Sequence, residues 1–188
     1  MRATSAATRH KLSVEDYHKL GAAGILTEDN RVELINGELI DMAPIGSLHA
    51  SVVSTLSMFF ARHVGDRAIV STQNPVILPP DSEPQPDIAL LKPRADRYRN
   101  ALPTATDAML IIEAADTTLD YDRTIKLPRY ASHGIPEMWI VDLQSRRVEV
   151  YREPGTDRYS QFVELRTGDV AAPSMLPTVT LGVDEIFS

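Results

Sequence analysis

The sequence contains no cysteine, so disulfide bonds, a thiol nucleophile and thiolate metal ligands are all excluded. Long hydrophobic runs are also missing: the longest unbroken apolar stretch, Ala108 to Ile112, is far too short to span a bilayer. Aromatic residues make up only 6% of the chain, yet 43% of its 188 residues are hydrophobic and they recur in dense clusters. This composition excludes disorder as the main state and predicts one globular domain around a single core.

Positive charge is also in short supply. The chain has 19 Lys and Arg residues against 26 Asp and Glu residues, and its formal charge of −7 predicts weak nonspecific attraction to nucleic acid, although a local basic strip could still dock a phosphate backbone. Residues 1–11 are basic but lack the apolar core of a signal peptide, so we expect a flexible tail there. The expected domain spans residues 12–188 of a cytoplasmic protein.

The first forty residues predict a short helix followed by a β-hairpin. Ser13 and Asp16 have the spacing of a helix N-cap and its acidic N3 residue. Asn36-Gly37 separates two runs of alternating apolar residues, 31–35 and 38–42. Asn-Gly between such runs is a strong hairpin signal, because both turn residues need a positive φ.

The rest of the chain predicts a mixed α/β fold, with a central sheet covered by helices. The helices are expected at 47–64, with Ser47 as the N-cap, and at 120–133, where Pro128 should kink or split the helix. The nearly continuous apolar run 108–114 is typical of a strand that is covered on both faces. The expected strands are 68–71, 76–78, 86–91, 108–114, 138–142, 147–151, 161–165 and 179–181.

Three residues are candidates for chemistry, and each also has a simpler structural explanation. Glu113 ends the most hydrophobic strand, where a carboxylate is costly unless a cation, a hydrogen bond or solvent meets it. Asp87 follows Pro86 at the start of a strand and could equally cap a turn. Lys126 lies on the second helix, where Asp122, four residues earlier, could pair with it on an exposed face.

Together, two acids at strand ends and a lysine on the next helix are the groups that a metal-dependent nuclease uses. Two carboxylates can hold a hard divalent cation such as Mg²⁺ and leave positions for water and a phosphate oxygen. The ion lowers the pKa of the water and neutralises charge on the phosphoryl group. An ammonium group beside the water orients it and stabilises the transition state.

A resemblance to a known family rests on six short pieces of sequence in a fixed order. They are Val32-Glu-Leu-Ile-Asn-Gly-Glu38, His49-Ala50, Gln85-Pro-Asp-Ile-Ala-Leu90, Ile111-Ile-Glu-Ala-Ala-Asp-Thr-Thr118, Tyr121-Asp-Arg-Thr-Ile-Lys126 and Gly134-Ile-Pro-Glu-Met-Trp-Ile-Val-Asp142. Any one of them would be weak support, but six in order are strong. Over roughly residues 12–152 the chain resembles the Uma-type family of restriction endonucleases, within the PD-(D/E)xK nuclease superfamily.

The resemblance implies a restriction endonuclease-like fold, a Mg²⁺ cofactor with Mn²⁺ as a substitute, DNA as the substrate and a homodimer. Asp87 matches the Asp of the Pro-Asp motif, and Glu113 matches the acid of the (D/E)xK motif. The chain departs from the superfamily pattern at Ala115, where the lysine would stand. Lys126 matches the position on the following helix to which this family moves it.

Three further residues could complete the site. Glu33 is the preferred extra metal ligand and Glu38 comes close behind it, because the alternation of the hairpin does not fix which face is which. His49, near the start of a helix, could orient a water or a phosphate where the helix dipole favours an anion. The simpler explanations are solvated hairpin glutamates and a histidine that only packs.

Substrate contact is predicted for the basic segment 92–99, which carries four cations and one acid, a net charge of +3. Tyr98 within it could stack on a base, whereas Trp139 is expected in the core. The simpler explanation of the segment is a solvated surface loop. The candidates for phosphate contact are Arg94, Arg97, Arg99 and Arg123, with Arg129 extending the strip.

The leading hypothesis is therefore a Mg²⁺-dependent DNA endonuclease in which water attacks a phosphodiester in line. The alternative is a catalytically inactive module that keeps the nuclease fold for binding or assembly, which the negative charge and the displaced lysine favour mildly. A third hypothesis, Lys126 as a nucleophile toward a carbonyl substrate, has no supporting residue nearby.

Overall fold

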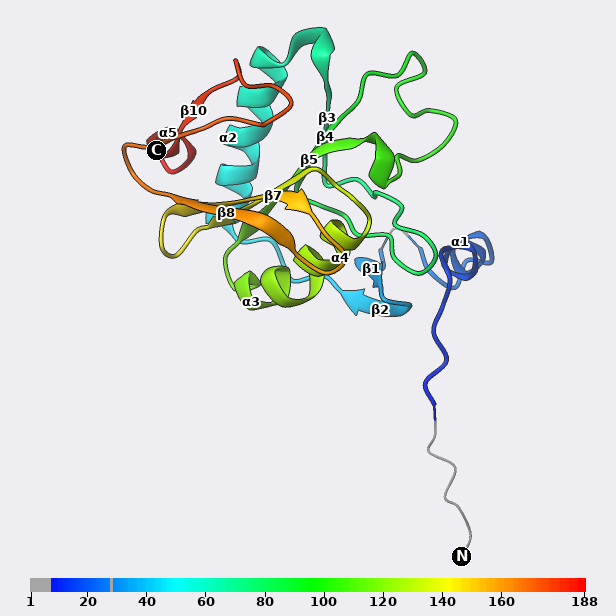
Figure 1. Cartoon of the computed structure of the whole chain (residues 1–188). Coiled ribbons are helices and arrows are strands. Elements are labelled where there is room, and N and C mark those ends of the chain that lie inside the picture. Colours follow the sequence, from blue (N-terminus) through cyan, green and yellow to red (C-terminus); the bar gives the residue numbers. More distant parts are fainter. Residues whose placement is uncertain (1–7, 28) are drawn as a thin grey trace, which may run out of the picture.

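A six-stranded mixed sheet forms the centre of the fold (Figure 1). The computed structural model describes residues 8–27 and 29–188, so the first seven residues of the predicted tail lie outside the described residues. The sheet order is β3-β4-β5-β6-β7-β8, and neighbouring strands are antiparallel except for the parallel pair β5 and β6. The strands are β3 (Ile69–Thr72), β4 (Ile88–Leu91), β5 (Ala108–Ala115), β6 (Glu137–Asp142), β7 (Arg147–Pro154) and β8 (Tyr159–Leu165).

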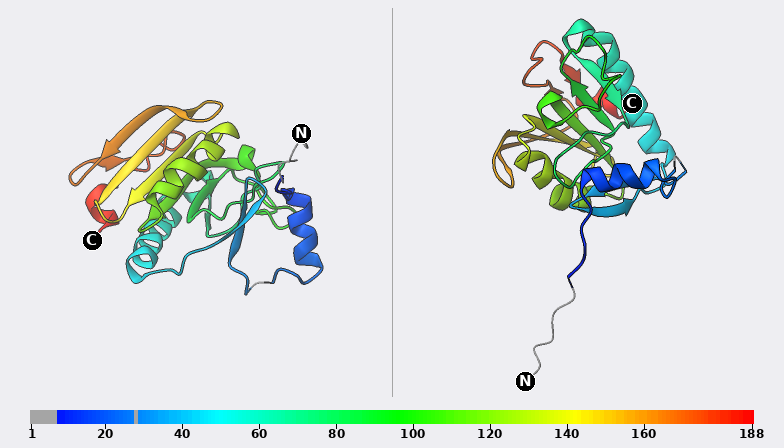
Figure 2. Two further views of the ribbon diagram at one scale, coloured as in Figure 1. Left: turned by 90° about the horizontal axis from the view of Figure 1, so that it is seen from below. Right: turned by 90° about the vertical axis from the view of Figure 1, so that its right-hand side faces the viewer.

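Helices cover both faces of this sheet (Figure 2). On one face, α2 (Ser47–His63) and the C-terminal segment pack against the sheet, and Phe60 and Trp139 are fully buried between them. On the other face lies the connection from β5 to β6, as parallel strands require a crossover. The remaining elements on these faces are α3 (Leu119–Tyr121), η3 (Asp122–Lys126), α4 (Leu127–Ser132), η1 (Gly65–Arg67), η2 (Ala105–Asp107), β9 (Val170–Ala171), β10 (Leu181–Gly182) and α5 (Val183–Ile186).

The structure confirms the predicted fold class, the burial of Trp139 and the continuous burial of the apolar strand. All residues of β4, β5 and β6 are buried. Within the described part of the chain, no helix combines the length and the apolarity that a bilayer crossing requires.

The N-terminal helix and the hairpin form as predicted. Helix α1 (Val14–Ala22) begins after Ser13, whose side chain completes a capping box with Asp16. The strands β1 (Val32–Ile35) and β2 (Glu38–Asp41) pair antiparallel across Asn36 and Gly37, whose φ angles are 53° and 76°. The hairpin is joined to the rest of the domain by the N–H of Glu83, which donates to the carbonyl of Leu34, 2.7 Å away.

The predicted strand 76–78 is wrong. The N–H groups of its first and third residues donate to one segment and the N–H of its middle residue donates to another, but the segment forms only isolated bridges, at Ile77 and Leu78. The three acceptors are Pro84, Pro103 and Ser82. Prolines at 75, 79 and 80 also flank the segment and provide no N–H for a ladder.

Two boundaries differ from the expected ones. Ser47 is the first residue of α2 and Gly46 is its N-cap, so the predicted serine cap is wrong. The predicted strand 179–181 is reduced to β10, which begins at Leu181 and pairs with β9.

Pro128 interrupts the second helix, as predicted. The helix winds as α3 and then as the π-helical turn η3, in which the N–H of Leu127 donates to the carbonyl of Asp122, five residues earlier. Pro128 stands in the first turn of α4, where its missing N–H is tolerated. The widened turn precedes the proline, and such π-turns are frequent at functional sites.

We expect Gly37→Ala to lower the free energy of unfolding by about 1–3 kcal/mol. The φ of Gly37 is positive, and an added Cβ would lie 2.6 Å from the Cβ of Lys11 and 2.9 Å from the carbonyl oxygen of Leu12. Urea unfolding monitored by circular dichroism measures the change. Gly21→Ala is the matched control, because a Cβ there meets nothing within 4 Å and α1 should gain about 0.4–1 kcal/mol. Equal effects of the two substitutions would contradict this account.

Candidate active site

Strand register brings Asp87 and Glu113 to the same edge of the sheet. In the antiparallel pair of β4 and β5, Ile88 lies opposite Ile112, so Asp87, just before β4, faces Glu113 near the end of β5. The backbone N–H of Ala114 donates to Asp87 Oδ2 at 2.9 Å and fixes this arrangement. Two residues far apart in the sequence thus become neighbours through ordinary strand pairing.

Three donors hold the carboxylate of Asp87. Besides Ala114, they are Gln73, whose Nε2 lies 3.2 Å from Oδ1, and His49, whose Nε2 lies 3.0 Å from Oδ2. Burial raises the pKa of Asp87, but the hydrogen bond and the charge of His49, with the other donors, bring the pKa below its ordinary value. The acid is therefore ionised, and the bond to it raises the pKa of His49.

Lys126 joins two further acids. Its Nζ lies 3.2 Å from Glu113 Oε1 and 3.3 Å from Glu33 Oε2. All three side chains are buried. Tyr130 donates its hydroxyl to Glu113 Oε1 at 2.7 Å, and the N–H of Gln85 donates to Glu33 Oε2 at 3.2 Å. The site therefore contains Glu33, the predicted additional acid, and the predicted lysine beside the predicted carboxylate.

Burial and the charges of neighbouring side chains shift the pKa values of Glu113 and Lys126. Burial raises the pKa of Glu113 to about 8, against the attraction of Lys126. Burial alone would lower the pKa of Lys126, but the negative charges of Glu113, Glu33 and Asp122 raise it above its ordinary value. Lys126 therefore stays an ammonium ion, which can donate hydrogen bonds but cannot accept a proton.

Asp122 is a site residue that the sequence did not reveal. It is buried, it accepts a hydrogen bond from Thr118 Oγ1 at 2.7 Å, and burial raises its pKa to about 6. The simpler explanation of Lys126, a pair with Asp122 on an exposed helix face, is wrong, because both side chains are buried and the lysine pairs with Glu33 and Glu113. The sequence signal that could have indicated Asp122 is its place in the piece Tyr121-Asp-Arg-Thr-Ile-Lys126, which also contains the predicted lysine.

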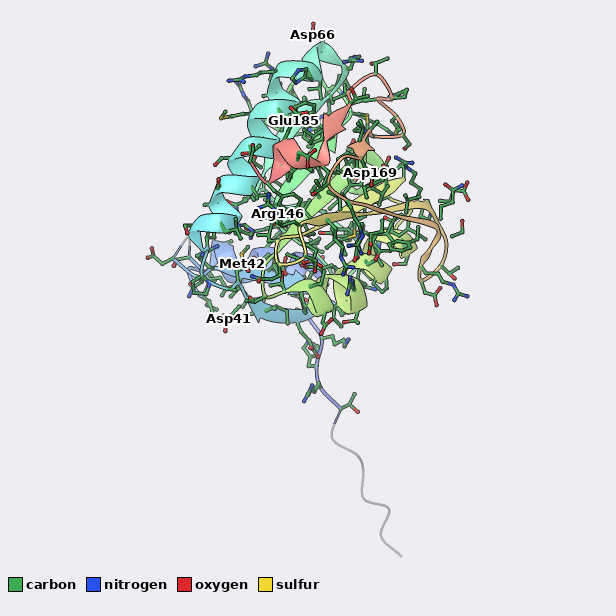
Figure 3. All side chains as sticks on the ribbon, turned by 90° about the vertical axis from the view of Figure 1, so that its left-hand side faces the viewer. Asp41, Met42, Asp66, Arg146, Asp169 and Glu185 are labelled. Carbon is green, nitrogen blue, oxygen red and sulfur yellow. The ribbon has the colours of Figure 1, made fainter. Side chains whose placement is uncertain are left out.

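A cleft of about 270 Å³ opens onto these residues. The hairpin, the start of α2, the end of β5 and the turn η3 contribute to its wall. Figure 3 shows two of the lining residues, Asp41 and Met42, at the opposite end of the molecule from Asp66. The cleft residues discussed above are Glu33, His49, Gln73, Gln85, Asp87, Glu113, Asp122 and Lys126.

Glu38 does not join the site. It lies on β2 beside the hairpin turn, its side chain is 46% exposed, and it does not line the cleft. Of the two predicted hairpin ligands, the fold therefore turns Glu33 inward and leaves Glu38 exposed to solvent.

The basic segment 92–99 lies away from the cleft, so its predicted position next to the acids is wrong. The segment follows the last residue of β4, whereas Asp87 precedes the first, and the length of the strand separates them (Figure 1). The side chains of Arg97 and Arg99 are exposed, and neither residue, nor Arg94, lines the cleft. Contact between these arginines and a substrate stays a prediction.

Other predicted contact residues already have partners in the protein. Arg94 Nε lies 2.6 Å from Asp96 Oδ1, and its guanidinium stacks 3.9 Å above the centre of the Tyr98 ring, which limits base stacking on that face. Arg123 pairs with Glu149 on β7, with Nε 3.0 Å from Oε2. Arg129 pairs with Asp81. Each of these three arginines therefore already has a carboxylate partner, and their contact with a substrate stays a prediction.

The donor chemistry of the cleft fits Mg²⁺. Among residues 8–27 and 29–188, no three His, Asp or Glu side chains are arranged to hold a metal ion together. Mg²⁺ is usually held by only one or two carboxylates together with water and a substrate phosphate. Asp87 and Glu113 supply two carboxylates in one cleft, and Glu113 Oε2 has no hydrogen bond to any described residue.

Comparison with known proteins agrees with this architecture. Residues 14–184 match the model of the Uma2 family, described as "putative restriction endonuclease". The chain belongs to the Uma2 family. Its fold is similar to the crystal structure of a "putative nuclease belonging to DUF820" from Anabaena variabilis ATCC 29413, with a TM-score of 0.76, 17% sequence identity and coverage of 94% of this chain and 97% of that chain.

At that identity the likeness shows the fold alone. No curated protein matches the chain. Family membership confirms the resemblance found in the sequence, and the structural likeness confirms the predicted nuclease fold.

We expect the free energy of unfolding of the metal-free protein to fall as the pH rises from about 5 to about 8. Glu113 and Asp122 hold their protons more tightly in the folded than in the unfolded chain, so the folded state loses this advantage once the pH exceeds their ordinary values. The slope is at most about 1.4 kcal/mol per pH unit for each group. Urea unfolding in EDTA at a series of pH values measures it.

Glu113→Gln should flatten this profile above pH 6, because the amide does not titrate. A smaller fall should remain above pH 6.5 from His49, whose raised pKa acts in the same direction. Asp66→Asn, on the exposed surface far from the cleft, should keep the wild-type profile. A stability that rises between pH 6 and 8 would contradict the raised pKa of Glu113.

Proposed function

We propose that the cleft is the active site of a Mg²⁺-dependent DNA endonuclease that hydrolyses phosphodiester bonds. The observation that carries the proposal is the meeting of Asp87 and Glu113 at one sheet edge, with the ammonium group of Lys126 3.2 Å from Glu113. Membership of a family described as restriction endonucleases supports it.

Asp87 and Glu113 would hold the ion, and the bound ion would polarise the phosphate and lower the pKa of water. The chain positions both carboxylates before any ligand arrives. His49 and the N–H of Ala114 orient Asp87, while Lys126 and Tyr130 orient Glu113. Such fixed donors remove part of the cost of arranging the site during the reaction.

Lys126 and Asp122 have different tasks in this proposal. Lys126, held as an ammonium ion, stabilises negative charge that develops on the phosphoryl group and orients water. Asp122 accepts the proton of the attacking water, because a carboxyl with a pKa of about 6 is largely ionised at neutral pH and still basic enough to take a proton.

The predicted homodimer and cytoplasmic location belong to the same proposal. One cleft holds one scissile phosphate, so two copies of the chain would be needed to cut both strands of a duplex together.

One observation favours the alternative, a nuclease fold kept for binding. Both Lys126 and Tyr130 direct their hydrogens to Glu113 Oε1, so a metal ion would reach this carboxylate through its other oxygen. If the protein is not an enzyme but a binding module, the pair of Lys126 and Glu113 would only stabilise the fold. Metal binding therefore separates the two functions.

Asp87→Asn and Glu113→Gln should each lower cleavage of supercoiled plasmid DNA in Mg²⁺ or Mn²⁺ by at least about 100-fold. Each change removes one carboxylate charge from the cleft and retains its shape. Gel electrophoresis of nicked and linear products measures the rate, and Asp66→Asn should cleave like the wild type. Calorimetric titration with Mg²⁺ should show binding that both site variants lose.

If the two variants cleave as fast as the wild type, the activity belongs to a contaminant. A wild-type protein that neither cleaves nor binds the ion would support the binding module instead.

Asp122→Asn, in which the proposed proton acceptor is replaced by an amide, should lower the cleavage rate by about 100-fold and remove the acidic limb of the rate profile. The measurement is the initial cleavage rate from pH 5 to 9 at saturating Mg²⁺. An unchanged limb in the variant would assign the proton transfer to another group.

A further inference from the structure

Two buried polar atoms in this cleft have no hydrogen-bond partner. Among the described residues, these atoms are the hydroxyl oxygen of Tyr121 and Nδ1 of His49, and both residues line the cleft that contains Asp87 and Glu113. A buried polar atom without a partner costs about 1–3 kcal/mol, and folded proteins satisfy nearly all of them. Two such atoms in one cleft indicate that their partners belong to something that binds there.

The hydroxyl of Tyr121 is available as a donor. Burial, and then the negative charge of Glu33, raise the pKa of Tyr121 above its ordinary value, so the group keeps its hydrogen. The nearby carboxylates receive hydrogen bonds from other groups and none from Tyr121. These donors are Gln85 to Glu33, Thr118 to Asp122, and Lys126 and Tyr130 to Glu113, and Lys126 also forms an ion pair with Glu33.

An uncharged hydrogen-bond donor such as the hydroxyl of Tyr121 is useful for binding a phosphate in this acidic cleft. Ionised acids of the cleft such as Asp87 repel an approaching phosphate, and the nearby cation, Lys126, is already in contact with Glu33 and Glu113. Besides the charge of Lys126, a phosphate oxygen that enters the cleft therefore gains from a donor that is not bound to a carboxylate. The hydroxyl of Tyr121 is such a donor.

We propose that Tyr121 is a catalytic residue whose hydroxyl donates a hydrogen bond to a non-bridging oxygen of the scissile phosphodiester. This inference rests on the proposed function, since the phosphodiester is its substrate. It adds a contact that the sequence did not indicate, one residue before Asp122 at the start of the π-helical turn.

Tyr121→Phe tests the contact, because it removes the hydroxyl and keeps the ring. The hydroxyl bonds to no described residue, so the free energy of unfolding should be unchanged or slightly raised. Cleavage of supercoiled plasmid in Mg²⁺ should fall by about 10²–10³-fold, the usual effect of losing one donor to transition-state charge. Mg²⁺ affinity, measured by calorimetry, should stay at the wild-type value.

Tyr151→Phe is the matched control. Its hydroxyl donates to Glu149 Oε2 at 2.8 Å on β7, and Tyr151 does not line the cleft. This variant should lose stability and keep its cleavage rate, the reverse of Tyr121→Phe. The two tyrosines therefore separate a contact to the substrate from a contact that stabilises the fold.

A second measurement distinguishes this inference from the proposed function. The probe is a fluorescein-labelled DNA duplex, bound in Ca²⁺ and followed by fluorescence anisotropy. If the wild type cleaves and Tyr121→Phe cleaves equally fast, water alone satisfies the hydroxyl and only this inference fails. If the wild type binds the duplex without cleaving it and Tyr121→Phe binds more weakly, the phosphate contact stands and the hydrolytic function fails. A wild type that neither cleaves nor binds overturns both.

Discussion

One buried ammonium group joins three separate parts of the molecule. Lys126, on the turn η3, contacts Glu33 of the hairpin and Glu113 of the central sheet. Without the cation, two buried carboxylates would be left uncompensated, which typically costs about 3–5 kcal/mol. The same contact connects the hairpin to the sheet, and both elements contribute to the wall of the cleft. The stability of this region and the chemistry of the site therefore depend on one interaction.

In the cleft, an anionic substrate would be attracted by Lys126 and repelled by the ionised acids. Asp87 is held ionised by three donors, whereas Glu113 has a raised pKa because burial outweighs the attraction of Lys126. Acids outnumber cations among the residues that line the cleft. A phosphate would approach such a wall favourably only together with a cation, which agrees with the metal dependence that we propose. The pKa values of the two acids are thus shifted in opposite directions although the acids share one edge of the sheet.

Local signals predicted the local structure well, and long-range features were missed. The hairpin at Asn36-Gly37 and the strand 108–114 form as expected, because turn chemistry and continuous apolarity act over a few residues. The segment 76–78 forms only isolated bridges, because prolines flank it and its partner Pro84 has no N–H to return a hydrogen bond. The burial of Asp122 does not follow from the sequence, because a sequence does not show where a helix widens or what covers it. The segment 92–99 is close to Asp87 in sequence but not in space, because the strand β4 runs between them.

The crossover between the parallel strands has a consequence for synthesis of the chain. Glu33, Asp87 and Glu113 all leave the ribosome before Lys126, and the crossover that carries this lysine is fixed only when β6 pairs with β5. Before Lys126 is synthesised, the nascent polypeptide holds these three acids and lacks the ammonium group that pairs with Glu33 and Glu113. The parallel pairing also closes a long loop, which makes it a slow, late event in folding. The group of acids around Lys126 is therefore completed only after the crossover has folded, so an unfinished polypeptide lacks the assembled cleft while it is still being made.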